Sequence, residues 1–256
     1  RQWSRGLGDV YKRQIYHYLK SKNINVNDLT LLEKSEYFRE KISEKSKVKV
    51  NFIKNIYDYK IDNGDVVFIY SNEFFDAIGS KQFIYDNGNF NEIKISKNND
   101  EYLLIKDSTI ISRELLNIYS SYNFKDNDIL EHSNLILNIL SDIQKLEFKK
   151  YFFTTTDYGY TKLPFKSTLR LLSNHKKLNL FDKFENVDYS FGVNFELMNS
   201  FFLKNNPSII YQKDLILNNL PSEYLKSSDK NIKEMIDLIS GKKFEGMGTC
   251  LLYTSP

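Results

Sequence analysis

The stretch Val66-Val-Phe-Ile-Tyr-Ser-Asn-Glu-Phe-Phe-Asp-Ala77 decides the fold. Residues 66–70 are the most continuous apolar run of the chain, which is typical of a strand covered on both faces of a parallel sheet. The polar side chains of Asn72, Glu73 and Asp76 follow it closely. The stretch therefore predicts a parallel strand that ends in a polar loop.

The segments around this stretch alternate between strand and helix patterns. We expect strands over residues 28–33, 48–53, 151–156 and 209–216, and helices over residues 15–21, 129–146, 195–203 and 229–239 and from an N-cap at Ser35. Residues 82–105 contain two turn signals, which predicts antiparallel hairpins inserted beside the main sheet. The Asp-Tyr-Gly-Tyr run at 157–160 predicts the end of the strand before it. The fold class is therefore α/β with an antiparallel insertion.

The composition excludes several classes of protein and site. The chain has 256 residues, 41% of them hydrophobic, which suits one large domain or two small ones with a real core. Cys250 is the only cysteine, and His17, His132 and His175 lie far apart in the sequence. These counts exclude a disulfide framework and a cysteine-rich metal site, and we expect no bound metal. No apolar run approaches the roughly 18 residues of a transmembrane helix, so we expect no membrane insertion.

The two ends differ in composition from the middle. Residues 1–14 hold Trp3, the only tryptophan, and three of the six arginines, and residues 250–256 hold the only cysteine. Both ends resemble translated library-adapter sequence, so we expect residues 15–249 to form the domain and both ends to pack poorly. That body carries 32 Lys and Arg against 32 Asp and Glu. Because its charges cancel, we expect no nucleic-acid partner.

Polar residues stand at the predicted carboxyl ends of three strands. They are Glu33, the loop 72–76, and Asp157 with Tyr158. In open α/β sheets, ligands bind beyond these ends. Glu33, at the tip of the second strand, is suited to accept hydrogen bonds from both hydroxyls of a ribose. Simpler interpretations remain open: a solvated strand end for Glu33, a turn cap for Asp157, and helix-start carboxylates in the loop.

The run Asn72-Glu-Phe-Phe-Asp-Ala77, followed five residues later by Gln82-Phe83, resembles the signature of the MidA-like S-adenosylmethionine-dependent methyltransferases. Further matching segments follow in the same order: Asp157-Tyr-Gly-Tyr160, Thr168-Leu-Arg170, His175 and Met247-Gly-Thr249. The resemblance spans about residues 15–249. It implies a Rossmann-like class I methyltransferase sheet with the hairpins of residues 82–105 added, and S-adenosyl-L-methionine as the cofactor.

The family includes a mitochondrial assembly factor for respiratory complex I that methylates a protein arginine. The resemblance therefore implies an arginine side chain as methyl acceptor and a protein as partner, with a complex I subunit as the candidate. A guanidinium needs carboxylates to hold and polarise it. We expect Glu73 and Asp76 to do this as catalytic residues, with Asn72 as an orienting acceptor. The resemblance gives Glu33 the ribose of the cofactor.

Three further residues are candidates for binding the substrate. Asp157 and Tyr158 are expected to line the substrate side of the cleft. Glu131 opens the predicted helix over 129–146 and is a candidate second acidic contact. Its simpler interpretation is a carboxylate at a helix start.

The chain also departs from the family pattern. The family's glycine-rich loop has no counterpart, because Gly6-Leu-Gly8 lies in the predicted adapter without a strand before it. Where the family reads A-H-V-D-F, this chain reads Phe191-Gly-Val-Asn-Phe195. We therefore expect an N-terminally truncated domain that binds the cofactor weakly and is inactive alone.

Two other functions stay open at this point. A non-catalytic assembly chaperone with the same fold would be compatible with the departures at Gly192 and Asn194. A nucleotide-dependent dehydrogenase fits the acidic strand tip but not the signature at 72–77. The wealth of Lys, Asn, Ile, Tyr and Phe is typical of an AT-rich genome and predicts a bacterial cytoplasmic protein; in a eukaryote we expect the mitochondrial matrix.

Overall fold

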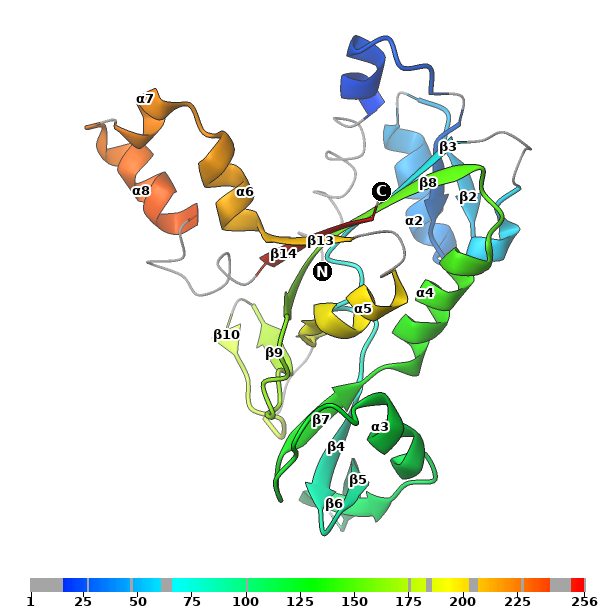
Figure 1. Cartoon of the computed structure of the whole chain (residues 1–256), viewed down its shortest axis with the longest axis vertical. Coiled ribbons are helices and arrows are strands. Elements are labelled where there is room, and N and C mark those ends of the chain that lie inside the picture. Colours follow the sequence, from blue (N-terminus) through cyan, green and yellow to red (C-terminus); the bar gives the residue numbers. More distant parts are fainter. Residues whose placement is uncertain are drawn as a thin grey trace.

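The computed structural model describes residues 16–26, 28–46, 48–60, 66–99, 101–174, 176–182, 186–202, 207–226, 228–239 and 250–255. Trp3, His175 and the segment Met247-Gly-Thr249 lie outside these ranges. Along the long axis, the central strands occupy the middle and upper part of the molecule, and the inserted sheet lies at the lower end (Figure 1). The arrangement is mixed α/β, as the sequence predicted.

The central sheet is built around a long strand, β8 (Lys150–Tyr160). It runs parallel to β3 (Val66–Asn72), with Val66 opposite Lys150 and Asn72 opposite Thr156. The predicted strand at 66–70 is therefore confirmed. The expected cover on both faces is wrong at its start, because Val66 and Phe68 are exposed.

The predicted break at residues 157–160 is wrong, because β8 continues through them. The short strand β12 (Val193–Asn194) pairs with β8 in parallel and places Val193 opposite Gly159. A Cβ on Gly159 would meet the carbonyl oxygen of Val193 at 2.2 Å and the Phe195 ring at 2.6 Å. This glycine therefore serves a close approach of two strands and not a turn.

Residues 250–256 were expected to pack poorly, and the backbone of their described part forms a strand of the central sheet. Residues 250–255 form β14 (Cys250–Ser255), which pairs antiparallel with β8 and with β13 (Ser208–Tyr211). Its backbone therefore lies between β8 and β13 and joins them in the central sheet. The adapter origin of the two ends stays a prediction.

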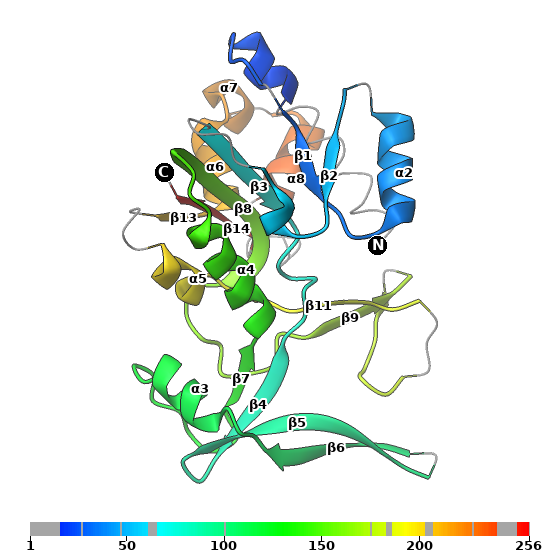
Figure 2. The ribbon, with the colours of Figure 1, turned by 90° about the vertical axis from the view of Figure 1, so that its right-hand side faces the viewer.

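A separate pair of parallel strands carries Glu33, the predicted tip of the second strand. It consists of β1 (Thr30–Leu32) and β2 (Asn51–Ile53), with a 3-10 turn at Ile56–Asp58. The helix α2 (Glu36–Lys45) connects the two strands and is capped by Ser35, whose hydroxyl accepts the N–H of Phe38. The predicted N-cap is thus confirmed. Figure 2 shows this pair beside β3 and β8 in the upper half of the molecule.

The inserted sheet is larger than the predicted hairpins. Its antiparallel strands, in the order β6-β5-β4-β7, are β4 (Lys81–Asp86), β5 (Asn89–Asn98), β6 (Glu101–Ser108) and β7 (Ile129–His132). Asn87 and Gly88 both have positive φ, as a tight hairpin turn requires. The helix α3 (Ser112–Ile118) packs on β5 and places Leu115 in a core with Phe83 and Phe90.

The predicted helix over 129–146 begins later than expected. Residues 129–132 are β7, which pairs with β4, and the helix is α4 (Asn134–Lys145). Ser133 separates the two, and its hydroxyl accepts the N–H of Ile136 as an N-cap. Apolar periodicity alone did not reveal this boundary.

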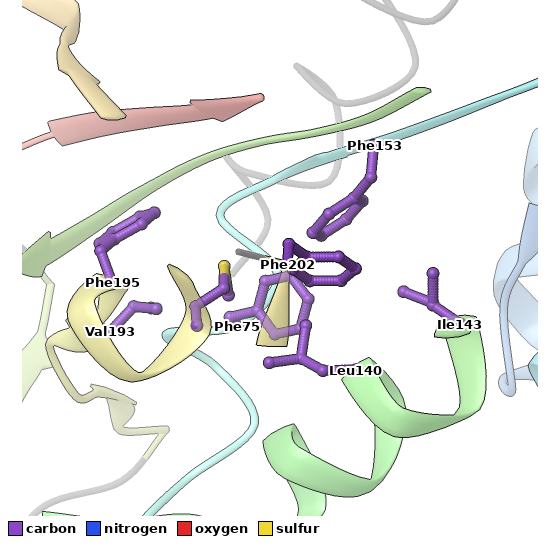
Figure 3. Close-up of a cluster of buried hydrophobic side chains, with 8 residues drawn as sticks. Phe75, Leu140, Ile143, Phe153, Val193, Phe195 and Phe202 are labelled. Atoms are coloured by element: carbon purple, nitrogen blue, oxygen red, sulfur yellow. The ribbon is translucent and has the colours of Figure 1, made fainter. Parts of the chain in front are cut away.

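The principal core lies between β8, α4 and the helix α5 (Phe195–Phe201), as Figure 3 shows. Its fully buried residues include Phe153 on β8, Leu140 on α4 and Phe202 after α5. Phe75, from the loop that follows β3, enters the same core and meets the Phe153 ring edge-on at 6.3 Å. Core packing therefore fixes the loop that carries the signature residues.

Further elements are a small antiparallel sheet and the helices that follow β13. A small antiparallel sheet consists of β9 (Arg170–Ser173), β10 (Lys176–Lys177) and β11 (Asp188–Ser190). The strand predicted over residues 209–216 is confirmed only at its start, in β13; from residue 212 the chain forms the helix α6 (Gln212–Asn219), which is followed by α7 (Ser222–Leu225) and α8 (Lys230–Ile239). Within the described ranges, no helix combines the length and the apolarity needed to cross a bilayer.

Candidate functional site

The candidate site is the loop at residues 73–76, directly after β3. The N–H of Glu73 donates to the carbonyl of Thr156 at 2.9 Å, so the pairing with β8 extends one residue beyond β3. Glu73 then takes a positive φ of 46°, unusual for a side chain of this size, and the chain turns away from the strand. Its side chain is exposed, whereas Asp76 is buried.

Asp157, at the neighbouring position of β8, holds this loop. Its Oδ2 accepts three backbone N–H groups, from Phe74 at 3.1 Å, Phe75 at 2.8 Å and Asp76 at 3.3 Å. Its Oδ1 accepts the N–H of Tyr158 at 2.8 Å, and the residue has no exposed surface. The structure therefore gives Asp157 a positioning task, and its predicted contact with substrate stays a prediction.

The charges at this site disfavour one another. Burial, and then the charge of Asp76, raise the pKa of Asp157, and the backbone N–H donors offset part of that rise. Partial burial, and then the charge of Asp188, raise the pKa of Glu73. Carboxylates in such surroundings favour a proton or a cation nearby.

Asp188 was not foreseen from the sequence. It opens β11 at the edge of the small sheet, outside every segment of the family resemblance, and a single acidic residue gives no pattern to detect. Its strand is tied to the loop, because the N–H of Phe191 donates to the carbonyl of Asp76 at 3.0 Å. The structure thus brings a fourth carboxylate to the loop.

Tyr158 follows Asp157 in β8, but its side chain contacts Arg170. The guanidinium of Arg170 lies over its ring, 5.6 Å from the centroid, in a cation–π contact. Both residues belong to segments that resemble the family. The substrate contact predicted for Tyr158 stays a prediction.

Glu33 lies on the separate pair of parallel strands. Its Oε1 accepts the N–H of Ser35 at 2.8 Å, and its carbonyl accepts the guanidinium of Arg39, with the Nε contact at 2.6 Å. The side chain is half-buried at the carboxyl end of β1, where the sequence predicted it. One carboxylate oxygen serves the local turn, and Oε2 is the oxygen that could receive a ribose hydroxyl.

Glu131 was predicted to open a helix, but it lies in β7 and is buried. Its Oε1 accepts the side-chain amide of Gln82 at 2.8 Å and the N–H of Thr168 at 2.9 Å, and its Oε2 accepts the Thr168 hydroxyl. That hydroxyl in turn accepts the N–H of Gly192 at 2.7 Å. Glu131 therefore joins the inserted sheet to the segments before β9 and before β12.

A buried histidine adjoins Glu131. The Nδ1 of His132 lies 3.1 Å from the Tyr119 hydroxyl, and its Nε2 lies 2.7 Å from Oδ1 of Asn134. Burial is the main cause that lowers its pKa, so the ring is neutral at pH 7. Among the described residues, no three His, Cys, Asp or Glu side chains are arranged to hold a metal ion.

A family model described as "Putative S-adenosyl-L-methionine-dependent methyltransferase" matches residues 11–209. The chain belongs to this family. The match confirms the family predicted from the signature at residues 72–77, and with it the cofactor of the family, S-adenosyl-L-methionine. No curated protein matches the chain.

Two solved structures from Burkholderia thailandensis share the fold of this family member. One, a methyltransferase-like protein bound to S-adenosyl-homocysteine, has a TM-score of 0.67 and 11% identity. The other, the native structure of an uncharacterised protein of the same superfamily, has a TM-score of 0.69 and 10% identity. Both matches cover 93% of this chain, and they cover 66% and 68% of those proteins, so the chain spans about two thirds of their length. At this identity the likeness shows the fold, and the roles of the site residues remain predictions.

Proposed function

We propose that the protein transfers a methyl group from S-adenosyl-L-methionine to an arginine side chain of a protein substrate, at the loop after β3. The observation that carries the proposal is the gathering of carboxylates there. Glu73 and Asp76 lie on the loop, Asp157 lies beneath it, and Asp188 influences Glu73 from β11. The pKa values of Glu73 and Asp157 are both raised.

A cationic acceptor fits these charges better than a neutral one. A guanidinium placed by Glu73 and Asp76 would compensate two carboxylates that otherwise repel their neighbours. It would also pair with a carboxylate through two parallel hydrogen bonds, which orients the accepting nitrogen. Glu73 has an exposed side chain and can reach an incoming substrate, while Asn72 ends β3 just before it.

Glu33, the predicted cofactor residue, has a carboxylate oxygen that suits a ribose hydroxyl. Glu33 keeps Oε2 for a hydroxyl at a strand tip, while its Oε1 is fixed by Ser35. When bound, S-adenosyl-L-methionine supplies a methyl group already activated on a sulfonium sulfur. The residues of this chain therefore have to hold the acceptor nitrogen in line with that methyl group and exclude water around it.

The partner follows from the same proposal. The acceptor is a protein arginine, and a subunit of respiratory complex I is the candidate that the family resemblance suggests. Tyr158 is retained as a proposed contact on the substrate side; Glu131, which is buried with both carboxylate oxygens engaged, is not. A non-catalytic assembly chaperone is the alternative, and it predicts cofactor-independent binding of a partner without transfer.

The test is methyl transfer by the full-length protein from radiolabelled S-adenosyl-L-methionine to arginine peptides, with lysine and glutamine peptides as matched controls. After acid hydrolysis, chromatography identifies the labelled amino acid. We expect label in methylarginine alone, and its loss in Glu73→Gln. Label in another amino acid would contradict the acceptor, and partner binding without any transfer would favour the chaperone.

A further inference from the structure

A cavity of about 410 Å³ lies beside the loop after β3. Three parts of the chain line most of it: residues 79–81 before β4, residues 132–135 at the start of α4, and Tyr189 and Phe191 at the end of β11. Ile111, before α3, completes the lining. None of the predicted cofactor, catalytic or substrate residues lines this cavity.

The walls of the cavity are attached to the candidate site. Phe191 donates its N–H to the carbonyl of Asp76 at 3.0 Å. Gly79 follows Asp76 by three residues, so their Cα atoms are at most about 11 Å apart. Gly79 has a φ of +86°, which favours glycine, and a Cβ at this position would stand 3.8 Å from the Tyr189 ring, so the two residues are neighbours in the wall. The cavity therefore borders the proposed acceptor site.

Most of the polar side chains that line the cavity are already engaged. Both ring nitrogens of His132 have partners, and the Ser133 hydroxyl caps α4. Lys81 pairs with Glu92 at 3.0 Å. No carboxylate is among the lining residues, in contrast to the loop beside them. The cavity therefore offers a guest few unused charges or hydrogen-bonding groups.

The apolar groups of the cavity remain open to solvent. Leu135 is 51% exposed and Tyr189 is 44% exposed. Burying these side chains against an apolar guest would be favourable. The chemistry of the walls thus selects an uncharged, apolar group.

We propose that this cavity binds a large apolar side chain of the substrate protein, two or three residues from the methylated arginine. The inference rests on the proposed function, which places the arginine at Glu73 and Asp76. Two to three extended residues span about 7–10 Å, which lies within the upper limit of about 11 Å between Asp76 and Gly79 in the cavity wall. The enzyme would then recognise a cation and an apolar residue at a fixed separation.

The experiment measures the binding of fluorescent peptides to the full chain by anisotropy. Each peptide carries one arginine and a leucine placed one to five residues away on either side, with alanine at that place as the control. We expect leucine at two or three residues on one side to tighten binding about tenfold. Leu135→Lys should abolish that gain. The matched control Leu103→Lys, an equally exposed leucine on β6, should keep it.

The outcomes separate this inference from the proposed function. Equal affinity for leucine and alanine peptides at every spacing, or equal losses in Leu135→Lys and Leu103→Lys, would overturn the cavity proposal. Replacing the peptide arginine by glutamine tests the acceptor separately: an unchanged leucine effect with no arginine effect would overturn only the acceptor. Dimers that dissociate in Leu135→Lys and that no peptide displaces would show a second copy in the cavity, which also overturns the proposal.

Discussion

Asp157 and Glu131 are both buried carboxylates, but they hold different parts of the molecule in different ways. Asp157 accepts four hydrogen bonds, all from backbone N–H groups, and three of them come from one short loop. Glu131 accepts from Gln82, Thr168 and, more weakly, Ser167, mostly through side chains. Asp157 therefore fixes the backbone conformation of the loop, and Glu131 joins separate segments of the chain.

The difference indicates which of the two carboxylates can be substituted with the smaller loss of stability. Backbone donors of the loop at 74–76 cannot move without moving the loop itself, and buried donors that lose a partner are unfavourable. The side chains of Gln82 and Ser167 are partly exposed and can turn to water. We therefore expect the loop to depend on one residue, Asp157, and the junction at Glu131 to lose less.

Asp157→Ala should have the largest effect. It leaves three loop N–H groups without an acceptor, at about 1–3 kcal/mol for each unsatisfied group. We expect a loss of roughly 3 kcal/mol or more in the free energy of unfolding at pH 6, measured by urea denaturation. A loss below about 1 kcal/mol would show that the loop keeps its shape without this carboxylate.

The pH dependence of stability should reveal the same residue. Because its pKa is raised, the folded protein binds a proton at Asp157 that the unfolded chain releases near pH 4. That contribution is fully present below pH 4 and is lost as pH rises toward the folded pKa. We expect wild type to lose on the order of 1–3 kcal/mol more than Asp157→Asn between pH 5 and pH 8. Parallel curves for the two proteins would contradict this.

Glu131→Ala should lower the free energy of unfolding least among these variants, by about 1–2 kcal/mol, because the groups that bond to Glu131 can form hydrogen bonds with water instead. Glu131→Gln should lose less still, since it keeps the shape and one accepting oxygen. The measurement is again urea denaturation, with Asp157→Ala in the same series. A loss for Glu131→Ala as large as that for Asp157→Ala would remove the distinction between the two carboxylates.

The sequence predicted β3 and the loop after it better than it predicted the elements around them. The apolar run at 66–70 and the polar loop after it stand out locally, so both were foreseen. The continuation of β8 through Gly159 was not, because Asp and Gly favour turns and only the approach of Val193 explains a strand there. The start of α4 was missed although Ser133 signals a helix N-cap.

The site itself was foreseen in part for the same physical reason. Residues on one loop, such as Glu73 and Asp76, form a pattern that can be seen in one dimension. Asp188 comes close to Glu73, and Tyr189 and Leu135 come together in the cavity wall, only in the folded chain. The loop contacts of Asp157 likewise come from residues more than 80 positions away in sequence.

The most direct test compares Glu73→Gln with Glu33→Gln in the full-length protein. Methyl transfer to an arginine peptide is measured at saturating S-adenosyl-L-methionine, cofactor affinity by calorimetry, and folding by thermal melting. Glutamine keeps the shape of Glu73 but loses the charge that pairs with a guanidinium, so we expect turnover to fall on the order of a hundredfold with cofactor affinity nearly unchanged. Glu33→Gln should do the reverse and weaken cofactor binding with little effect on the saturated rate. A fully active Glu73→Gln enzyme would contradict our central claim and place the acceptor elsewhere.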